Sequence, residues 1–236
     1  FGHIPTTVLA MADASIGGKT GIDYEGLKNY IGVIRVPSFV WVDQIFLSTL
    51  SAKQKTSGLA EIVKHAIIGS KELWDLLTAI NSVEEISWES ILKTNLPIKV
   101  KIVESDLSEK GYRKVLNFGH TIGHAVESYF LSTSTSITHG QCVATGMLVE
   151  SKISNSLGLL NNEDFNAIVR IADQLLEPIR ISLPTFAELN RWMMRDKKKS
   201  NAIIGFSLPD RIGSCRWDIP VDEQVISDSF QWLAQV

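Results

Sequence analysis

Two patterns of hydrophobic and polar positions divide the chain near residue 50. Before that point, short apolar runs such as TTVLAM and SFVWVDQ are separated by SIGGKTG and RVPS. Runs this short, bounded by Gly and Pro, are typical of strands. After it, apolar residues recur at helical spacing, which predicts helices. The predicted helices cover residues 52–68, 71–79, 82–107, 115–131, 138–157, 162–178, 184–197 and about 222–234.

These patterns predict an α/β remnant over residues 1–50, followed by a mostly α-helical domain over residues 51–236. The helix predicted over 184–197 begins with Pro184 and a capping box formed by Thr185 and Glu188. The stretch AIIGFSLPDRIGSCRWDIP, residues 202–220, predicts a small β-hairpin. The sequence contains no internal repeat, which argues against a solenoid.

Composition excludes several classes of protein. The net charge of −3 contains no basic excess for nucleic-acid binding. Apolar runs such as SFVWVDQIFL are too short and too interrupted to cross a membrane, and the first residues lack the pattern of a signal peptide. Cys142 and Cys215 form no CxxC motif, which favours reduced thiols. We therefore expect a cytoplasmic protein that binds neither nucleic acid nor membrane. Because the chain opens on Phe1, directly in an apolar run, we also expect further sequence upstream.

The stretch DASIGGKTG resembles the end of a phosphate-binding P-loop, because Gly18, Lys19 and Thr20 have the required order. A P-loop has a further glycine where this chain has Asp13. A carboxylate there would repel a phosphate. The stretch is therefore not interpreted as a nucleotide-binding loop of that type.

Histidines supply the strongest local signal, in NFGHTIGHAVE. His120 and His124 lie one helical turn apart, about 6 Å along the axis, and could share one metal ion. His139 could supply a third ligand and Glu61, in an otherwise apolar helix, a fourth candidate. Two histidines and a carboxylate form a known catalytic zinc site. The alternative is a buried histidine pair, with Glu61 bonded to Lys64.

Other histidines and cations remain open at this point. His65 forms a second i, i+4 pair with Glu61 and is a further candidate ligand, whereas His3 is interpreted as structural. A lysine in the apolar surroundings of Lys64 is costly unless it serves a ligand or an ion pair. The RDKKK group, residues 195–199, has the alternative interpretation of a solvated helix end.

Taken together, the motifs resemble 3-dehydroquinate synthase, of the sugar-phosphate cyclase superfamily. The matching strings are IPTTVLAMADASIGGKTGID, LKNYIGV, SGLAEIVKHAII, SDLSEKGYRKVLNFGHTIGHAVE, HGQCVATGM and RDKKKSNAIIGFSLP. The resemblance implies a lyase that converts 3-deoxy-arabino-heptulosonate 7-phosphate to 3-dehydroquinate and phosphate, in the shikimate pathway. The implied steps are transient oxidation by NAD, elimination of phosphate and intramolecular aldol closure.

The resemblance also implies roles for individual residues. The implied metal ligands are Glu61, His120 and His139, with zinc as the metal and cobalt possible by ligand type. His124 then contacts substrate and does not bind the metal. The implied catalytic and substrate-binding residues are Asp13, Lys19, Lys64, Lys99, Arg113, Asn117, His124 and Lys197, with Lys198 as the competitor of Lys197.

The N-terminal 50 residues are implied to be the C-terminal part of an α/β NAD-binding domain. The implied cofactor contacts are Thr7, Asp13, Lys28, Asn29, Thr49 and Leu50. Ala14 departs from the serine that the family pattern has after the aspartate. Because the glycine-rich segment that holds the NAD pyrophosphate in the family has no counterpart here, we expect the isolated chain to bind NAD poorly and to be nearly inactive.

Three other interpretations stay open. A related cyclase, of the 2-deoxy-scyllo-inosose or 2-epi-5-epi-valiolone synthase type, would take a substrate without the carboxylate. A metal-dependent alcohol dehydrogenase would accumulate NADH. A non-catalytic fragment of the fold would bind no metal. A homodimer is expected from the resemblance alone.

Overall fold

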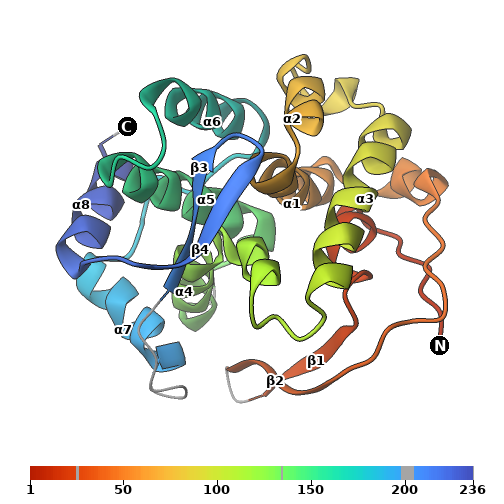
Figure 1. Ribbon diagram of the computed structural model, residues 1–236, viewed down its shortest axis with the longest axis horizontal. Helices are drawn as coiled ribbons and strands as arrows, with labels where there is room; N and C mark the ends of the chain where they lie inside the picture. Colours follow the sequence, from red (N-terminus) through yellow and green to blue (C-terminus); the bar gives the residue numbers. More distant parts are fainter. Residues whose placement is uncertain (25–26, 134, 198–204, 236) are drawn as a thin grey trace.

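The computed structural model describes residues 1–24, 27–133, 135–197 and 205–235. A central helix, α5 (His139–Ser156), is buried on almost every side. It packs against four other helices and a hairpin strand (Figure 1). Small and apolar residues surround its axis in the sequence GQCVATGMLVESKIS, and a helix that is apolar all round belongs in a core. The helices against it are α1 (Ala52–Gly69), α4 (His120–Ser132), α6 (Asn162–Leu175) and α8 (Glu223–Leu233).

The remaining elements surround this core. The described part of the chain is mostly helical, with two small antiparallel sheets of two strands each. The other helices are α2 (Lys71–Thr78), α3 (Trp88–Ser105) and α7 (Phe186–Lys197). The hairpins are β1 (Lys19–Tyr24) with β2 (Leu27–Ile34), and β3 (Gly205–Arg211) with β4 (Ser214–Pro220). The short helical turns are η1 (Ala10–Ala14), η2 (Gln44–Thr49), η3 (Val83–Glu85) and η4 (Tyr112–Asn117).

The predicted helices and the C-terminal hairpin are confirmed, with two helix starts corrected. Helix α3 begins at Trp88 and not near residue 82, because residues 83–85 form the separate turn η3. Helix α4 begins at His120 and not at 115, because η4 ends at Asn117 and Gly119 then takes φ +79°. That left-handed backbone conformation favours glycine and interrupts the helix.

The two predicted N-terminal strands are wrong. TTVLAM forms a helical turn that leads into η1, in which Thr7 Oγ1 accepts a hydrogen bond from the Ala10 amide at 3.1 Å. Helical spacing places Val8 and Met11 on one face, where both are fully buried. SFVWVDQ contributes only one bridge, between His3 and Val40. The described residues contain no parallel sheet, so the α/β remnant is not confirmed.

Two glycines on α5 allow the helices of the core to approach closely. A Cβ atom on Gly140 would lie 2.2 Å from the Ser57 carbonyl oxygen on α1. A Cβ atom on Gly146 would lie 1.9 Å from the Gly119 carbonyl oxygen, just before α4. These are backbone contacts that a side chain cannot avoid by changing rotamer. The glycines therefore set the distance from α5 to the two neighbouring elements.

Substitution of Gly146 by Ala is expected to lower the free energy of unfolding by about 3 kcal/mol, the upper range for overpacking a core. The added methyl group must push the start of α4 away from α5. Denaturant unfolding measures the effect. Gly158→Ala is the control for adding a methyl group, because no atom lies within 4 Å of a Cβ atom built at Gly158. The only destabilisation expected there is the backbone strain of an alanine at φ +72°. Equal stability of Gly146→Ala and the wild type would contradict this account of the packing.

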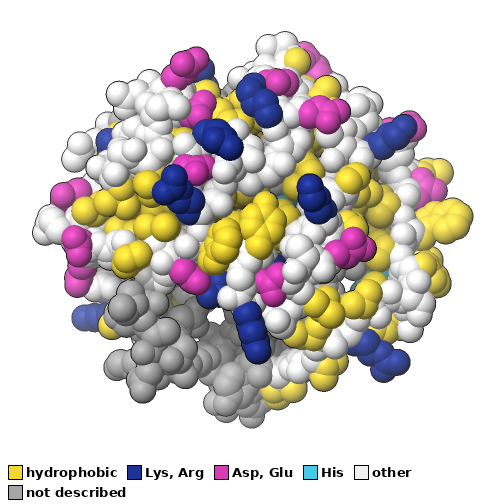
Figure 2. Space-filling model, viewed as in Figure 1, with side chains coloured by type: hydrophobic (Ala, Val, Ile, Leu, Met, Phe, Trp, Pro, Cys, Tyr) yellow, Lys and Arg dark blue, Asp and Glu magenta, His cyan; other side chains and the backbone are white. Residues whose placement is uncertain are grey.

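Exposed hydrophobic side chains concentrate in the first 46 residues. They are Phe1, Ile4, Ile31, Val33, Ile34, Val36, Phe39, Trp41, Ile45 and Phe46. In Figure 2, yellow side chains gather at the right-hand edge, where Figure 1 shows the N-terminal segment.

Among the described residues, no helix combines the length and the apolarity needed to cross a bilayer.

Candidate functional site

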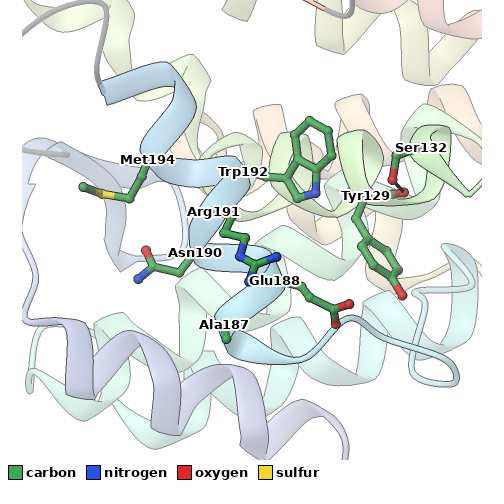
Figure 3. Close-up of a pocket in the computed structure, with 8 residues that line it drawn as sticks. All are labelled: Tyr129, Ser132, Ala187, Glu188, Asn190, Arg191, Trp192 and Met194. Carbon is green, nitrogen blue, oxygen red and sulfur yellow. Dashed lines mark hydrogen bonds between the residues drawn. The ribbon is translucent and has the colours of Figure 1, made fainter.

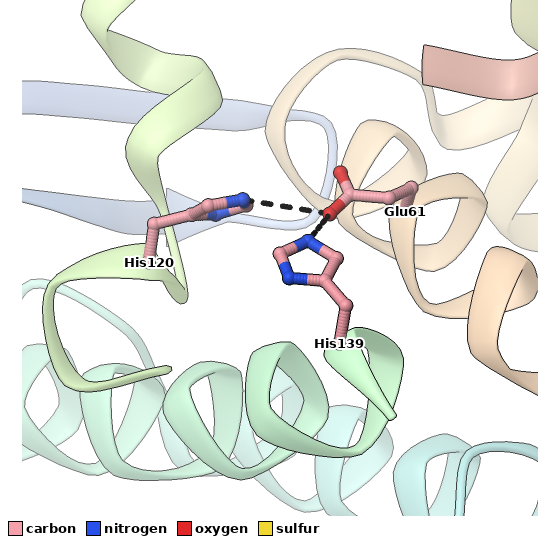
Figure 4. A group of neighbouring side chains, drawn as sticks. All are labelled: Glu61, His120 and His139. Carbon is pink, nitrogen blue, oxygen red and sulfur yellow. Dashed lines mark hydrogen bonds and ion pairs between the residues drawn. The ribbon is translucent and has the colours of Figure 1, made fainter. Parts of the chain in front are cut away.

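The side chains of Glu61, His120 and His139 converge on one centre (Figure 4). Glu61 projects from the middle of α1, and the two histidines are the first residues of α4 and α5. Oε1 of Glu61 lies 3.2 Å from His139 Nε2 and 3.5 Å from His120 Nε2. The glutamate side chain is 1% exposed, and the histidines are partly open. The arrangement can hold a divalent metal ion.

Both imidazoles point the same type of nitrogen at this centre. His120 Nδ1 lies 3.1 Å from the Phe118 carbonyl oxygen, which can only accept a hydrogen bond. His139 Nδ1 lies 3.4 Å from Glu127 Oε2. When each Nδ1–H is donated to an oxygen, the Nε2 lone pair is left for a metal, as in most metal-binding histidines. The donor set therefore fits zinc or cobalt.

Charges around the centre determine which of these groups are ionised in the metal-free protein, where protons compete with a metal for the histidine nitrogens. Burial alone would raise the pKa of Glu61, but Lys64, His120 and His139 hold the pKa well below its usual value. Burial alone would lower the pKa of His139, but Glu127 and Glu61 raise it to about 9. Glu127 was not among the predicted site residues. Its signal lies in the string GHAVE, because it is three residues after His124 on the same helix.

Glu150, on α5, fixes the position at which α4 begins. Its carboxylate is fully buried and accepts hydrogen bonds from the amides of Gly119 at 2.6 Å and Ile122 at 3.0 Å. These amides belong to the N-terminal turn of α4, which has no partners of its own within the helix. Glu150 therefore holds the backbone on both sides of His120. Burial raises its pKa to about 8, although the backbone hydrogen bonds lower it in part.

The substitution Glu150→Gln is expected to change how stability depends on pH. Between about pH 4.5 and 8 the unfolded chain has lost the Glu150 proton and the folded chain keeps it, so wild-type stability falls as pH rises. The unfolding free energy falls by at most about 1.4 kcal/mol per pH unit. Above about pH 8 Glu150 is ionised in both states, so this pH dependence disappears. Glutamine does not titrate, so the variant lacks this contribution to the pH dependence of stability. The difference in unfolding free energy between wild type and variant, measured by urea unfolding across this interval, isolates Glu150. A constant difference would contradict the raised pKa.

A second cluster of charges lies beside the first. Asp13, in η1, places Oδ1 2.5 Å from Lys99 Nζ, 3.4 Å from His65 Nε2 and 3.9 Å from Lys64 Nζ. Lys64 also lies 2.5 Å from Glu61 Oε2 and so connects the two clusters. All except Asp13 are buried. Burial opposes the charged forms, but Lys99 keeps the pKa of Asp13 below its usual range, and Glu61 and Asp13 raise the pKa of Lys64.

Three predicted substrate-binding residues meet around Glu109, which was not predicted. Lys19 forms an ion pair with its carboxylate, Asn117 Nδ2 donates to it at 2.9 Å, and Arg113 Nε lies 3.9 Å away. Burial opposes ionisation, but Lys19 and Asn117 lower the pKa of Glu109. An acidic side chain thus occupies the centre of a cationic cluster. The sequence signal was the acidic residue inside SDLSEKGYR, two positions before a glycine.

The guanidinium of Arg113 is held by backbone. It donates to the carbonyl oxygens of Leu107 and Gly17, each at 2.9 Å. Asp106 organises the loop that carries it, by accepting from the amides of Gly111 at 2.7 Å and Arg113 at 3.2 Å. Gly17 has φ +119°, and a Cβ atom there would lie 2.6 Å from Arg113 Nη2. The double glycine of SIGGKTG therefore brings backbone up to this cation.

His124 lies beside the metal candidates without joining the converging set. Its ring is 4.9 Å from that of His120 and 6.2 Å from that of His139, measured between centroids. Thr7 caps the turn before η1, Thr49 is exposed, and Leu50 packs against the core. None of these three belongs to the clusters above. The side chains of Lys28, Asn29 and Lys197, and the whole of Lys198, lie outside the described residues.

A separate depression of about 670 Å³ lies between α4 and α7 (Figure 3). Tyr129 and Ser132 line it from α4, and Glu188, Arg191 and Trp192 from α7. None of the residues predicted for the site lines it. We do not assign it to the chemistry described above.

Comparison with known families covers most of the chain. Residues 58–199 match the profile described as 3-dehydroquinate synthase C-terminal, and residues 1–57 match the profile described as 3-dehydroquinate synthase N-terminal. A 3-dehydroquinate synthase from Acetivibrio thermocellus is 37% identical over 90% of this chain and 60% of its own length. One from Pyrococcus furiosus is 39% identical over 98% of this chain and 66% of its own length. The chain thus spans about two thirds of these relatives or less.

Solved structures of two related cyclases share the fold. A 2-epi-5-epi-valiolone synthase from Streptomyces hygroscopicus, with NAD+ and Zn2+ bound, has a TM-score of 0.90 and 26% identity, over 100% of this chain and 66% of its own. A 2-deoxy-scyllo-inosose synthase in complex with carbaglucose-6-phosphate, NAD+ and Co2+ has a TM-score of 0.85 and 26% identity, over 98% of this chain and 66% of its own.

Proposed function

We propose, from the premise that the chain belongs to the 3-dehydroquinate synthase family, that the protein is itself a 3-dehydroquinate synthase. It would convert 3-deoxy-arabino-heptulosonate 7-phosphate to 3-dehydroquinate and phosphate. The observation that carries the proposal is the convergence of Glu61, His120 and His139 beside a cluster of buried cations. A sugar acid phosphate needs both features, because it offers hydroxyl groups to a metal and anionic groups to lysine and arginine.

We assign the metal to these three residues, with zinc as the first candidate and cobalt as the second. The two cyclase structures that share the fold contain Zn2+ and Co2+. When bound, the metal supplies Lewis acidity to substrate oxygens. Glu127 and the Phe118 carbonyl orient the two imidazoles. We assign His124, one turn after His120, to substrate.

We assign the anionic ends of the substrate to the cations around Glu109. Lys19 and Asn117 contact Glu109 here, and both would exchange this carboxylate for a substrate anion. Arg113 is already fixed by two backbone carbonyls, so its role combines binding with support of the SIGGKTG loop. Lys99 would contact the substrate carboxylate with Arg113, Lys64 would reach toward the ring, and Asp13 would lie near the oxidised hydroxyl. The role of Lys197 in binding the substrate phosphate is proposed on the family resemblance alone.

We propose NAD as the cofactor because the structures that share the fold contain it. Its position on the side of Asp13 is proposed on the family resemblance. The bound nicotinamide supplies the hydride acceptor for transient oxidation of one substrate hydroxyl. Residues 1–50 would be the part of the NAD-binding domain that contacts the substrate, and residues 51–236 the metal and substrate domain. Thr7, Lys28, Asn29, Thr49 and Leu50 are proposed as further contacts. A cytoplasmic homodimer is proposed on the family resemblance.

A related cyclase activity is the second candidate, because both structural neighbours named above are cyclases of that kind. The two functions differ in the substrate carboxylate. Protein expressed from the complete gene is therefore assayed for phosphate release from the carboxylated heptulosonate phosphate and from glucose 6-phosphate. We expect release from the first only, with NAD unchanged after turnover. Release from glucose 6-phosphate only would replace the first proposal with the second, and net accumulation of NADH would indicate a dehydrogenase.

A further inference from the structure

A fixed hydrogen-bonding chain determines which nitrogen of His65 carries a proton. His65 and Asn95 are both fully buried. Asn95 Nδ2 donates to the Ala12 carbonyl oxygen at 3.2 Å, and a carbonyl can only accept. The amide of Asn95 therefore has one orientation, with Oδ1 toward His65 Nδ1 at 2.8 Å. Because Oδ1 also only accepts, Nδ1 of His65 must carry the hydrogen.

The other ring nitrogen, Nε2, carries a hydrogen only when the ring is a charged imidazolium. Nε2 of His65 makes no hydrogen bond within the described part of the chain. It faces Asp13 Oδ1 at 3.4 Å, so that a lone pair and a carboxylate oxygen point at each other. Burial lowers the pKa of His65, and Lys64 and Lys99 lower it further, although Asp13 raises it. The neutral ring is therefore the resting form. The pair lacks one proton for a hydrogen bond.

A metal ion does not fit this second position. The ligand atoms of Asp13, Glu61 and His65 do lie within 4.8 Å of one another. Two ammonium groups already occupy the carboxylates, however: Lys99 Nζ lies 2.5 Å from Asp13, and Lys64 Nζ lies 2.5 Å from Glu61. A divalent cation would be repelled by both. A single proton needs only the gap between Nε2 and Oδ1.

We propose that Asp13 and His65 form a proton-holding pair that stores the proton of the substrate hydroxyl during its transient oxidation. This inference rests on the proposed function. The C–H bond of the alcohol breaks and its electron pair goes to NAD+ as hydride, while the O–H proton goes to Asp13 and on to His65 Nε2. A carbonyl and NADH form. In the later reduction the hydride returns to carbon and the same proton returns to oxygen, so atoms and charge balance.

The two partners divide the task by their surroundings. The Asp13 side chain is 25% exposed and faces the site, whereas His65 is fully buried behind it. Because Lys99 favours the ionised form of Asp13, the carboxylate passes the proton on and the imidazolium keeps it by a hydrogen bond to Asp13. Water cannot reach Nε2 to remove the proton. His65 acts through Asp13 and is a positioning residue, not a catalytic one.

Counting protons tests the proposal in wild-type protein expressed from the complete gene and loaded with NAD. The substrate is a phosphonate analogue with carbon in place of the ester oxygen, so that oxidation occurs and phosphate cannot leave. NADH is followed by absorbance and released protons by an indicator dye. Protons released on binding are subtracted with the analogue that lacks the oxidised hydroxyl. We expect NADH with almost no proton release. One proton per NADH would overturn the proposal, and no NADH at all would overturn the proposed function with it.

The substitution His65→Gln keeps a donor for Asn95 and removes the basic nitrogen. We expect the variant to release one proton per NADH and kcat to fall by about 10²-fold, with KM and metal content unchanged. His3→Gln, at a histidine that pairs with Val40 in a β-bridge, is the control and should behave as the wild type. A folded His65→Gln variant that retains the proton would overturn the proposal. If that variant does not fold, the number of protons released per NADH by the wild type still tests the proposal.

The resting state can be tested without substrate. The 15N resonance of His65 Nε2 in wild-type protein with metal bound is expected in the region of an unprotonated imidazole nitrogen at neutral pH, and that of Nδ1 in the protonated region. His65→Gln assigns the resonances by their loss. Protonation of Nε2 at rest would overturn the proposal, because the pair would already hold its proton.

Discussion

His139→Ala is expected to abolish metal binding by the full-length protein and to lower turnover by about 10³-fold or more, the order seen when one electrostatic stabiliser is lost from an active site. The substitution removes a nitrogen that lies 3.2 Å from Glu61 Oε1 and leaves only two ligands. It also removes the link between Glu127 and Glu61, because the His139 imidazole contacts both carboxylates. Metal content is measured after dialysis against metal-free buffer, by elemental analysis.

His124→Ala is the matched control for this prediction. Its ring lies 4.9 Å from that of His120 on the same helix, yet it is absent from the converging set. We expect the variant to keep one metal ion per chain and to lose turnover alone. Glu61→Ala should behave as His139→Ala. Full metal content in both ligand variants, or loss of metal from His124→Ala only, would show that the ligand set is wrongly assigned.

Lys64→Met is expected to lower the free energy of unfolding of the metal-free protein by about 3–5 kcal/mol at neutral pH, the range for breaking a buried ion pair. Methionine retains most of the length of lysine, so the effect is mainly electrostatic. The loss of the ammonium leaves Glu61, 1% exposed, and Asp13 with less positive charge nearby. Because a metal ion would compensate Glu61, zinc is expected to restore part of the loss. Urea unfolding with zinc and with a chelator measures both effects.

Lys71→Met provides the comparison at the surface. Lys71 and Asp75 form an ion pair on α2, but their side chains are 63% and 60% exposed. Exposed pairs contribute little, so this variant should stay within about 0.5 kcal/mol of the wild type. Equal effects of the two substitutions would show that Lys64 does not neutralise buried charge. An effect of Lys64→Met that zinc increases would contradict the connection between the two clusters.

Periodicity predicted the helices well because their packing follows from it. Segments such as residues 139–156 carry apolar or small residues at every turn, and the structure buries most of them. Periodicity failed for TTVLAM, where β-branched residues suggested a strand. The chain instead turns back with Val8 and Met11 against α1, and this contact outweighs the local preference. The strand β2 (Leu27–Ile34) was not predicted, although LKNYIGV is rich in β-branched and aromatic residues.

A motif pointed to each residue that the sequence proposed for the site, whereas residues that only contacts reveal were not proposed. Spacing and resemblance together proposed Glu61, His120 and His139, and the structure places these three together. Glu127 lies in a helix where an acidic residue is unremarkable, whereas Glu150 interrupts the apolar helix α5 as Glu61 interrupts α1 but was not proposed. Each becomes significant only because a histidine or a helix end from elsewhere in the chain meets it.

The sequence by itself determined the helical character of most of the chain and the residues able to bind a metal or an anion, because periodicity and side-chain chemistry are local properties. Tertiary structure alone decided which of these groups meet. It brought Asp13 to His65 and Lys99 across more than fifty positions of chain, and it buried His65 and Lys99 while Asp13 stayed partly exposed. The state of a proton there depends on burial and on distances of a few ångströms, and neither is written in the order of the residues.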